Sequence, residues 1–406
     1  MIVELHLLQS FPASNLNRDE VGQPKSVTFG GAQRGRVSSQ CLKRSARLEL
    51  PSLGIERENS AVRTKRLVEH AARAIDGLDP AGEDEPSDDS VALAREALLQ
   101  LGFKVDHRNF TQYLFFIRPT AAALLADFCR EHQKELTAIA TERAKLEAEK
   151  PKKGEEKKKH DKAVENLDKR QVAPKKEIQA RAAEILSADR AVDIALFGRM
   201  VANNTDFNVD AASQVAHAIS THAVVTEFDY FTAVDDLKPD DSPGADMIGT
   251  VDFNAACYYR YANLDTTQLA KNLAGAGESD PELERQAVDA WLRAFIRAVP
   301  SGKQNSMAAR TQPEVLLGVV REQGSWNLAN AFLKPVAGTD FMNESGTRML
   351  EQFRELRGFY DDGEIVSVTG AAVGSAASLD LPDDERVRSV SEFVSRVSTA
   401  AFSHYG

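Results

Sequence analysis

A strand pattern followed by a basic, glycine-rich loop and a capped helix dominates the start of the chain. Residues 1–9 alternate and are rich in leucine and β formers, so they predict a strand. Residues 10–37 predict a loop rich in Asn, Gly, Pro and Arg. Ser38 or Ser39 then caps a predicted helix over 39–49, which a proline ends. The chain therefore opens as a strand and a helix joined by a loop suited to close contact with a ligand.

Positive charge is concentrated in this region although the whole chain is acidic, with a net charge of -11. The segment from Arg18 to Leu48 contains seven cationic residues and two acidic ones, Asp19 and Glu20, which gives a local charge of +5 over 31 residues. The seven are Arg18, Lys25, Arg34, Arg36, Lys43, Arg44 and Arg47. An uncompensated acidic patch lies elsewhere, over 76–89. Because the distribution of charge matters more than its sum, a basic site can coexist with an acidic protein.

The chemistry of this loop suits a phosphate group. Gly30, Gly31 and Gly35 let the backbone approach a ligand closely, and Arg and Lys supply donors. Ser38 and Ser39 add hydroxyls at a helix N-terminus. The alternative is an ordinary glycine-rich loop followed by a solvated basic helix, and the chemistry of the segment alone favours neither interpretation. A nucleotide-triphosphate loop and a nucleophile elbow are excluded, because neither G-x-x-x-x-G-K-[ST] nor G-x-S-x-G occurs.

Two further segments are candidates for ligand contact. Residues 300–308, PSGKQNSMA, could form a second backbone-cradling loop, although a glycine C-cap is the favoured interpretation of that segment alone. Residues 227–236, EFDYFTAVDD, hold three aromatics in four residues that could stack on bases, with a hydrophobic core as the alternative.

The remaining patterns predict an α+β protein with two insertions. The pattern over residues 60–200 predicts helices. This stretch includes a charge-dense segment over 141–177, which predicts a solvated helical hairpin or a partly disordered insertion. The alternative is a basic arm that contacts nucleic acid. The other predicted elements are strands in THAVVTEFDYFTAVDD and MIGTVDFNAACYYRYANLD, a helix over 280–299, a strand over 314–321, and helices over 342–358 and 383–402. Removing the insertions leaves β-α-β-β-α-β, the ferredoxin-like or RRM topology, which commonly presents an open sheet face to single-stranded RNA.

Enzyme and metal chemistry find little support. Cys41, Cys129 and Cys257 lie far apart without metal-like spacing, which suits a reducing cytoplasm. His217 and His222 are five apart, so they do not share a helix face, and an exposed turn explains Asp235 and Asp236. The sequence has no run of 18 apolar residues, so we expect no membrane span. We expect no catalytic residue, no metal and no cofactor.

Five sequence blocks resemble the CasC family, the crRNA-binding backbone subunit of the type I-E CRISPR complex Cascade. They are LHLLQSFPASNLNRD, FGGAQRGRVSSQCLKR, GRM followed by QVAHAISTH, FDYFTAVDD and GKQNSMAA, in family order. The resemblance implies an RRM-like palm with a helical finger and a β-hairpin thumb. The implied domains are palm 1–55, finger 56–200, palm 201–223, thumb 224–256 and palm 257–406.

The resemblance also implies roles for particular residues. Guide RNA would be gripped by Arg18, Lys25, Ser38, Gln40, Lys43 and Arg44, and Arg34 and Arg36 of the same basic loop complete this set. Gly302, Lys303, Gln304 and Asn305 would form a second palm loop. Tyr230, Phe231 and Thr232 would lie on the thumb that wedges between bases, and Met200 would pack near a displaced base. The segment over 141–177 is longer than the family pattern.

The implied function is a structural subunit, not an enzyme, that binds the crRNA backbone without reading its sequence. It would oligomerise along the guide, preorder it for pairing with target DNA, and contact other Cascade subunits. Two alternatives stay open: an RNase that uses an acidic residue, and an RRM-like scaffold outside CRISPR systems whose partners are proteins.

Overall fold

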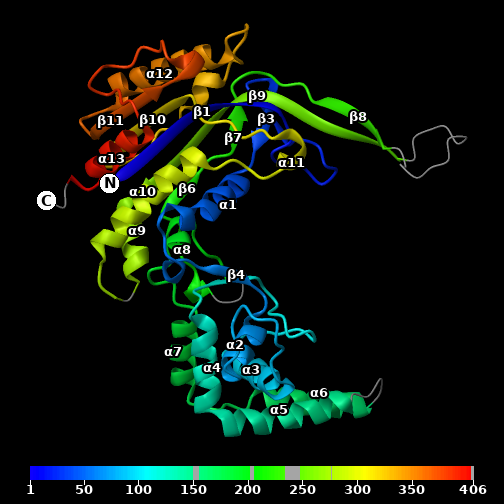
Figure 1. Cartoon of the computed structure of the whole chain (residues 1–406). Helices are drawn as coiled ribbons and strands as arrows, with labels where there is room; N and C mark the ends of the chain where they lie inside the picture. The colour runs from blue at the N-terminus through cyan, green and yellow to red at the C-terminus, as the bar shows by residue number, and fades with distance from the viewer. Residues whose placement is uncertain (150–154, 202–204, 234–246, 276, 404–406) are drawn as a thin grey trace, which may run out of the picture. The chain divides into compact units, whose positions relative to one another are not determined.

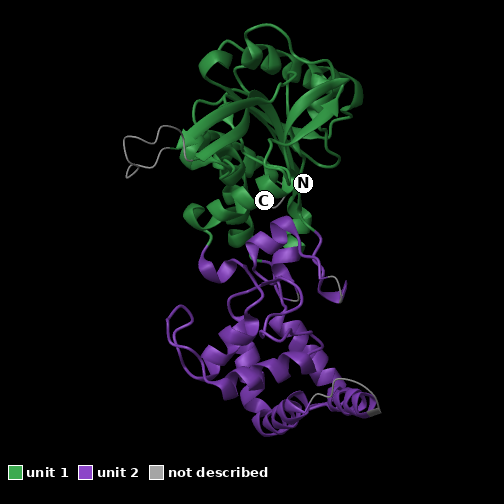
Figure 2. Cartoon of the chain, turned by 90° about the vertical axis from the view of Figure 1, so that its right-hand side faces the viewer, with its two compact units in different colours: residues 1–55, 211–271, 280–406 green, residues 56–210, 272–279 purple. Residues whose placement is uncertain are grey.

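The computed structural model describes residues 1–149, 155–201, 205–233, 247–275 and 277–403, which fall into two compact units (Figure 1 and Figure 2). Unit 1 comprises Met1–Ile55, Ala211–Lys271 and Asp280–Gly406. Unit 2 comprises Glu56–Asp210 and Asn272–Ser279. The sequence predicted a return to the first domain at residue 201, whereas unit 2 continues to Asp210 and also takes 272–279.

Unit 1 is built on one antiparallel sheet. Its nine strands are β1 (Ile2–Ser14), β2 (Ser26–Phe29), β3 (Ala32–Val37), β6 (Ser213–Val215), β7 (Ala218–Ser220), β8 (Glu227–Ala233), β9 (Met247–Asp265), β10 (Val315–Arg321) and β11 (Ile365–Ala372). The order is β11-β10-β1-β9-β7-β3-β2, with β6 and β8 also paired to β9. Its helices are α1 (Ser39–Glu49), η1 (Leu50–Leu53), α10 (Pro281–Arg297), α11 (Gln304–Met307), η4 (Leu328–Phe332), α12 (Phe341–Tyr360), η5 (Gly374–Ala376) and α13 (Val390–Ala401). Helix α9 (Thr266–Ala274) begins in unit 1 and ends in unit 2.

The predicted α+β class is confirmed, and the four central strands follow the predicted order of elements. In β10-β1-β9-β7, helix α1 precedes β7 and helix α10 lies between β9 and β10, which is β-α-β-β-α-β along the chain. Several local predictions were wrong. The loop over 10–37 contains the end of β1 and the hairpin β2–β3, THAVV lies between strands, and β11 was missed.

Both faces of this sheet are covered. Leu5 and Leu7 lie on the side of α1 and α10, where Leu42 and Phe295 contribute to the same small hollow. On the opposite side Leu8, Tyr259 and Tyr261 pack in one cluster with apolar residues of η4 and α12. The open RRM-type face expected from the topology is therefore absent at the central strands, because α12 and η4 occupy it.

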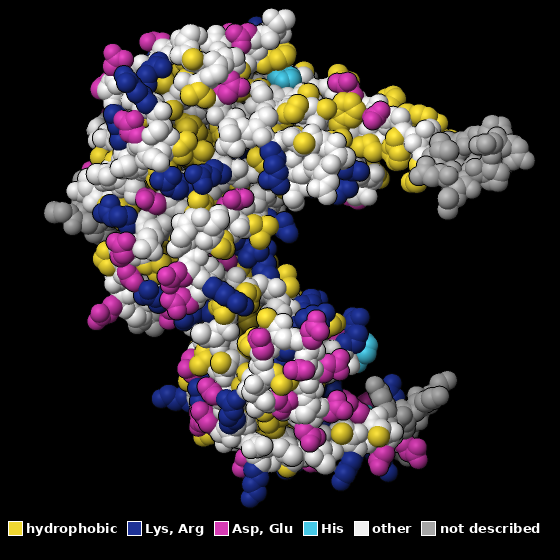
Figure 3. All heavy atoms as spheres, in the orientation of Figure 1, with side chains coloured by type: hydrophobic (Ala, Val, Ile, Leu, Met, Phe, Trp, Pro, Cys, Tyr) yellow, Lys and Arg dark blue, Asp and Glu magenta, His cyan; other side chains and the backbone are white. Residues whose placement is uncertain are grey.

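A two-stranded ribbon extends from the covered part of the sheet. β8 pairs with the first part of β9 in continuous register from Glu227↔Phe253 to Ala233↔Met247. Every residue of β8 is exposed, and hydrophobic side chains line the ribbon (Figure 1 and Figure 3). The turn-rich tip predicted between the strands lies outside the described residues, as do Asp235 and Asp236.

Unit 2 is helical, as the sequence predicted. It contains η2 (Arg57–Asn59), β4 (Val62–Thr64), α2 (Leu67–Ile75), α3 (Asp88–Gln100), β5 (Phe115–Ile117), α4 (Ala121–Glu131), α5 (Gln133–Ala148), α6 (Glu155–Asp168), α7 (Lys175–Ile185), α8 (Val192–Phe197) and η3 (Thr205–Phe207). Helices α5 and α6 form the hairpin predicted for the charge-dense segment. Arg143 of α5 pairs with Asp168 of α6 at 2.8 Å, which joins the two helices of the hairpin, and with Glu96 of α3 at 2.5 Å. No helix of the described ranges is long and apolar enough to cross a membrane.

Candidate nucleic-acid interface

The loop that follows β1 is closed on itself by its own polar groups. The amide of Lys25 donates to the Asn17 carbonyl at 2.9 Å. The backbones of Arg18 and Pro24 pair as an isolated antiparallel β-bridge. The Asp19 carboxylate accepts from two amides of the same loop, at 3.0 and 2.9 Å. This local bonding fixes the backbone and leaves the Arg18 side chain exposed.

The start of α1 is tied to this loop and to the segment before β7. Ser38 is the N-cap, because its hydroxyl accepts from the Cys41 amide at 3.3 Å. The Ser38 amide donates to the Asn17 side chain at 2.9 Å, and the Ser39 amide donates to Nδ1 of His217 at 3.3 Å. The predicted helix and its cap are confirmed. Ser38 is buried, however, and its hydroxyl serves the helix, so the structure does not support its predicted contact with RNA.

His217 is the residue of this cluster that sequence reasoning did not place in the site. It lies between β6 and β7 and also contacts the Arg36 guanidinium at 3.3 Å. Burial, with the charges of Arg36 and Lys25, lowers the pKa of His217 and favours the neutral ring. Only the motif QVAHAISTH, quoted for the family resemblance, pointed to it.

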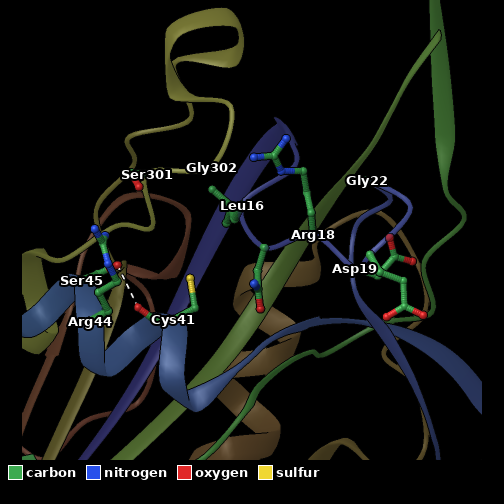
Figure 4. A pocket seen from close by; sticks show the side chains of 11 residues that line it. Leu16, Arg18, Asp19, Gly22, Cys41, Arg44, Ser45, Ser301 and Gly302 are labelled. Carbon is green, nitrogen blue, oxygen red and sulfur yellow. Dashed lines mark hydrogen bonds between the residues drawn. The ribbon is translucent and has the colours of Figure 1, made fainter. Parts of the chain in front are cut away.

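The two predicted loops meet. A Cβ atom on Gly302 would lie 2.4 Å from the Leu16 carbonyl oxygen and 2.6 Å from that of Asn15, so only glycine permits this approach. The contact forms one side of an open hollow of about 510 Å³ (Figure 4). Its lining residues are Leu16, Asn17, Arg18, Asp19, Glu20, Gly22, Cys41, Arg44, Ser45, Ser301 and Gly302.

Two of the residues that line this hollow, Arg18 and Arg44, are cationic, and Asp19 and Glu20 line it as well. Arg18, Arg44 and the polar Gln40 are exposed, and Lys25, Arg36 and Lys43 are half-buried. Among the described residues, Arg18, Lys25, Arg36, Lys43 and Arg44 form no salt bridge. Burial lowers the pKa of Lys43. Burial also raises the pKa of the Cys41 thiol.

Arg34 was predicted to bind RNA, and the structure contradicts this. Its side chain is 0% exposed. The guanidinium donates to the Ser220 carbonyl at 2.9 Å and to the Phe332 carbonyl at 2.7 Å, which joins β3 to the end of β7 and to η4. Arg34 therefore stabilises the fold, and a phosphate cannot reach it.

The second loop has its own internal order. The Gln304 amide group donates to the Pro300 carbonyl at 2.9 Å, so this side chain is engaged inside the loop. Lys303 adopts a left-handed backbone conformation with φ 52° and is half-buried, and Asn305 is exposed. Of the four predicted residues, only Gly302 lines the hollow.

The three ribbon residues do not share one face. Side chains alternate along a strand, so Tyr230 and Thr232 lie on one face of β8 and Phe231 on the other. Phe231 is paired with Gly249, and its ring occupies the space that a Cβ atom would take there, at 2.4 Å. Tyr230 is 60% exposed and Phe231 38%. A base inserted against the ribbon meets either the tyrosine or the phenylalanine, not both.

Met200 belongs to unit 2. It is 84% exposed and lines a shallow apolar hollow with Tyr113 and Leu114. Among the described residues no group of three or more His, Cys, Asp or Glu could hold a metal ion.

Comparison with known proteins places the chain in a family. The family model described as CT1975-like protein matches residues 3–396. A chain of a solved structure titled CRISPR RNA-guided surveillance complex, pre-nicking, shares 31% identity over 99% of this chain and 100% of that chain, with a TM-score of 0.80.

A chain of a second structure, titled CRISPR RNA-guided surveillance complex, shares 26% identity over 98% of this chain and 100% of that one, with a TM-score of 0.66. Among curated protein sequences no match was found. The family model and the 31% identical chain both span nearly the whole sequence, which confirms the resemblance drawn from the motifs. The chain belongs to the family of CT1975-like proteins.

Proposed function

We propose that this chain is a backbone subunit of a CRISPR RNA-guided surveillance complex of type I-E, which binds the phosphate backbone of a crRNA. One observation carries the proposal: the loop after β1, the start of α1 and the loop before α11 meet at one open hollow. Arg18 and Arg44 line it, and neither forms a salt bridge among the described residues. The similar chains belong to structures titled as RNA-guided surveillance complexes.

The chemistry of the hollow explains binding without sequence recognition. Arg and Lys side chains that reach phosphates position a strand but carry no information on its bases. A guide must vary in sequence, and pairing then supplies specificity. Several copies on one guide would form a helical filament, joined by other Cascade subunits, and a guide held in order loses less entropy when it pairs with target DNA.

The ribbon supplies the second part of the proposed mechanism. An exposed aromatic strand that leaves the covered sheet can insert between bases, since base stacking on an aromatic ring tolerates any sequence. Met200 and the apolar hollow of unit 2 offer a contact for a displaced base. We place the protein in the cytoplasm and assign it no catalytic role, no metal and no cofactor.

The test compares two double variants that remove the same charge from unit 1. Arg18→Ala/Arg44→Ala should weaken binding of unrelated single-stranded RNA sequences alike and flatten the salt slope by about 0.7 per lost phosphate contact. Lys271→Ala/Arg388→Ala removes two exposed cations away from the hollow and should behave as wild type. RNA binding is measured by filter retention between about 0.05 and 0.3 M salt, the range over which such contacts are screened. Equal binding by both variants would reject the proposal. If the absorbance ratio at 260 and 280 nm shows no RNA on wild type co-expressed with a guide, the protein-scaffold alternative is favoured.

A further inference from the structure

The hollow assigned to the guide holds two carboxylates that phosphate binding does not explain. Arg18 and Arg44 line it, and so do Asp19 and Glu20. The arginines suit phosphate oxygens, whereas a carboxylate repels a phosphate and weakens binding unless it meets a partner of its own. In Figure 4 Asp19 lies on the opposite side of the hollow from Arg44, with Arg18 between them. Because all four residues line one hollow, a strand bound there meets both kinds of side chain.

The two carboxylates differ in what they already bind. Oδ1 of Asp19 accepts from two amides of its own turn, at 3.0 and 2.9 Å, so Asp19 serves the fold of the loop. Glu20 is exposed in the same turn, and its side chain forms no hydrogen bond or salt bridge among the described residues. The backbone under it is ordered, because the Asp19 amide donates to the Gln23 carbonyl and the Asn15 side chain to the Gly22 carbonyl, both at 2.9 Å. Glu20 is therefore a fixed acceptor that is available to a ligand.

The chemistry of a nucleic-acid backbone offers one partner to such an acceptor. An ionised carboxylate only accepts hydrogen bonds, and so do the phosphate and sugar-ring oxygens. The 2′-hydroxyl of ribose is the donor that an RNA backbone carries, and deoxyribose lacks it. The N–H groups of bases are donors too, but contact with them would make binding depend on sequence, contrary to the proposed function. A carboxylate in this hollow therefore matches the sugar of RNA.

We propose that Glu20 is a specificity-determining residue, which accepts a hydrogen bond from a ribose 2′-hydroxyl and thereby selects RNA over single-stranded DNA. With RNA, this hydrogen bond offsets the repulsion between the carboxylate and the phosphates. With DNA, the repulsion remains and nothing offsets it. The arginines cannot supply this discrimination, because both backbones carry the same phosphates. The inference rests on the proposed function, since it assigns a role inside the hollow that binds the guide.

The test compares full-length wild type, Glu20→Ala and Glu351→Ala on three single strands of one sequence. The strands are RNA, RNA with fluorine in place of every 2′-hydroxyl, and DNA. The 2′-fluoro strand keeps the sugar conformation of RNA and removes only the donor. Glu351 is exposed on α12 and does not line the hollow, so Glu351→Ala controls for the loss of one negative charge from unit 1. Dissociation constants are measured by filter retention at about 0.1 M salt.

We expect wild type and Glu351→Ala to prefer RNA to the 2′-fluoro strand, and Glu20→Ala to lose on the order of fivefold of this preference. Glu20→Ala should also bind DNA more tightly than wild type does, because the repulsion is removed. An RNA preference in Glu20→Ala equal to that of wild type overturns the inference and leaves the proposed function standing. So does tighter binding of all three strands by one factor, which would make Glu20 a source of repulsion alone. Absence of RNA binding by wild type would reject the proposed function and, with it, this inference.

Discussion

Burial decides which arginines of the N-terminal region can act on a ligand. Arg34 and Arg44 are ten positions apart in one basic segment, yet Arg34 is fully buried on three carbonyl oxygens and Arg44 is exposed at the hollow. We expect Arg34→Ala to destabilise unit 1 by roughly 1–3 kcal/mol, because buried carbonyls lose their donor. Arg44→Ala should leave stability unchanged and weaken RNA binding. Urea unfolding followed by tryptophan fluorescence reports on unit 1, since Trp291 and Trp326 both lie in it. Unchanged stability in Arg34→Ala would contradict this assignment.

A buried histidine makes unit 1 sensitive to acid. His6 is 1% exposed, and its ring nitrogen lies 2.9 Å from the Tyr259 hydroxyl. Burial and the nearby Arg321 lower the pKa of His6 to about 3. The unfolded chain takes up this proton below about pH 6.5 and the native chain does not, so stability falls with pH between about 6.5 and 3. The slope from this one group is about 1.4 kcal/mol per pH unit.

His6→Asn should remove this contribution. The free energy of unfolding, measured in urea between about pH 7.5 and 4.5, should then vary less steeply with pH than in wild type. Leu8→Ala is the control, because Leu8 is buried on the same side of β1 and does not titrate. It should lower stability by roughly 2–5 kcal/mol and keep the slope. An identical slope in His6→Asn would show that His6 is not the acid-sensitive group.

At the level of single elements, local signals predicted some parts of unit 1 and missed others. The helix over 39–49 was predicted because its cap, Ser38, is adjacent in sequence. The β2–β3 hairpin was missed because its short strands lie in a segment rich in Asn, Gly, Pro and Arg, although Gly30 and Gly31, with φ 59° and 75°, are the residue pair that favours a two-residue hairpin turn. The position of α12 on the sheet could not be predicted, since its contacts link residues far apart in sequence. For the same reason the burial of Arg34 was not visible.

The contact between the two loops at the hollow depends on one glycine. Gly302→Ala places a methyl group against the Leu16 and Asn15 carbonyls, which overpacks the contact at a cost of roughly 1–3 kcal/mol or moves the loops apart. We expect weaker RNA binding in either case. Gly358→Ala is the control, because nothing lies within 4 Å of a Cβ atom there and the residue is helical. Filter binding and urea unfolding of both variants check this, and wild-type RNA affinity in Gly302→Ala would exclude a role for the loop contact.

The ribbon should be dispensable for folding and needed for assembly on RNA. Phe231→Ala removes an exposed ring from β8, so the tryptophan-detected unfolding midpoint of unit 1 should stay near that of wild type. If the ring stacks on a base, each subunit loses roughly 1–3 kcal/mol of contact, and cooperative binding to long RNA weakens. Tyr230→Ala, on the opposite face, tells which face meets the base. Chemical probing of the assembled guide should reveal periodically reactive bases. A uniform pattern would exclude insertion of the ribbon between bases, and unfolding of Phe231→Ala would show that this ring stabilises unit 1.

For the whole molecule, we propose that the protein binds nucleic acid and does not cleave it. Full-length protein loaded with guide RNA and paired DNA should leave both strands intact in Mg²⁺ or Mn²⁺, because we assign it no metal-binding or catalytic group. Denaturing gel electrophoresis over hours checks this. Cleavage that Asp235→Ala abolishes would establish the RNase alternative, and cleavage that persists in that variant would point to a contaminating nuclease.

The central place of β1 in the sheet has a consequence for synthesis on the ribosome. This strand is buried on both faces, and its partners are β9 and β10, from Ile2↔Asp265 and Ile2↔Arg321 onward. Contacts between such distant residues form slowly. At typical translation rates β1 waits on the order of tens of seconds for β9 to emerge. Unit 2, most of which lies in Glu56–Asp210, completes its sequence first. A nascent chain halted before Asp265 therefore exposes an unpaired apolar strand, the state that chaperones bind and that aggregates.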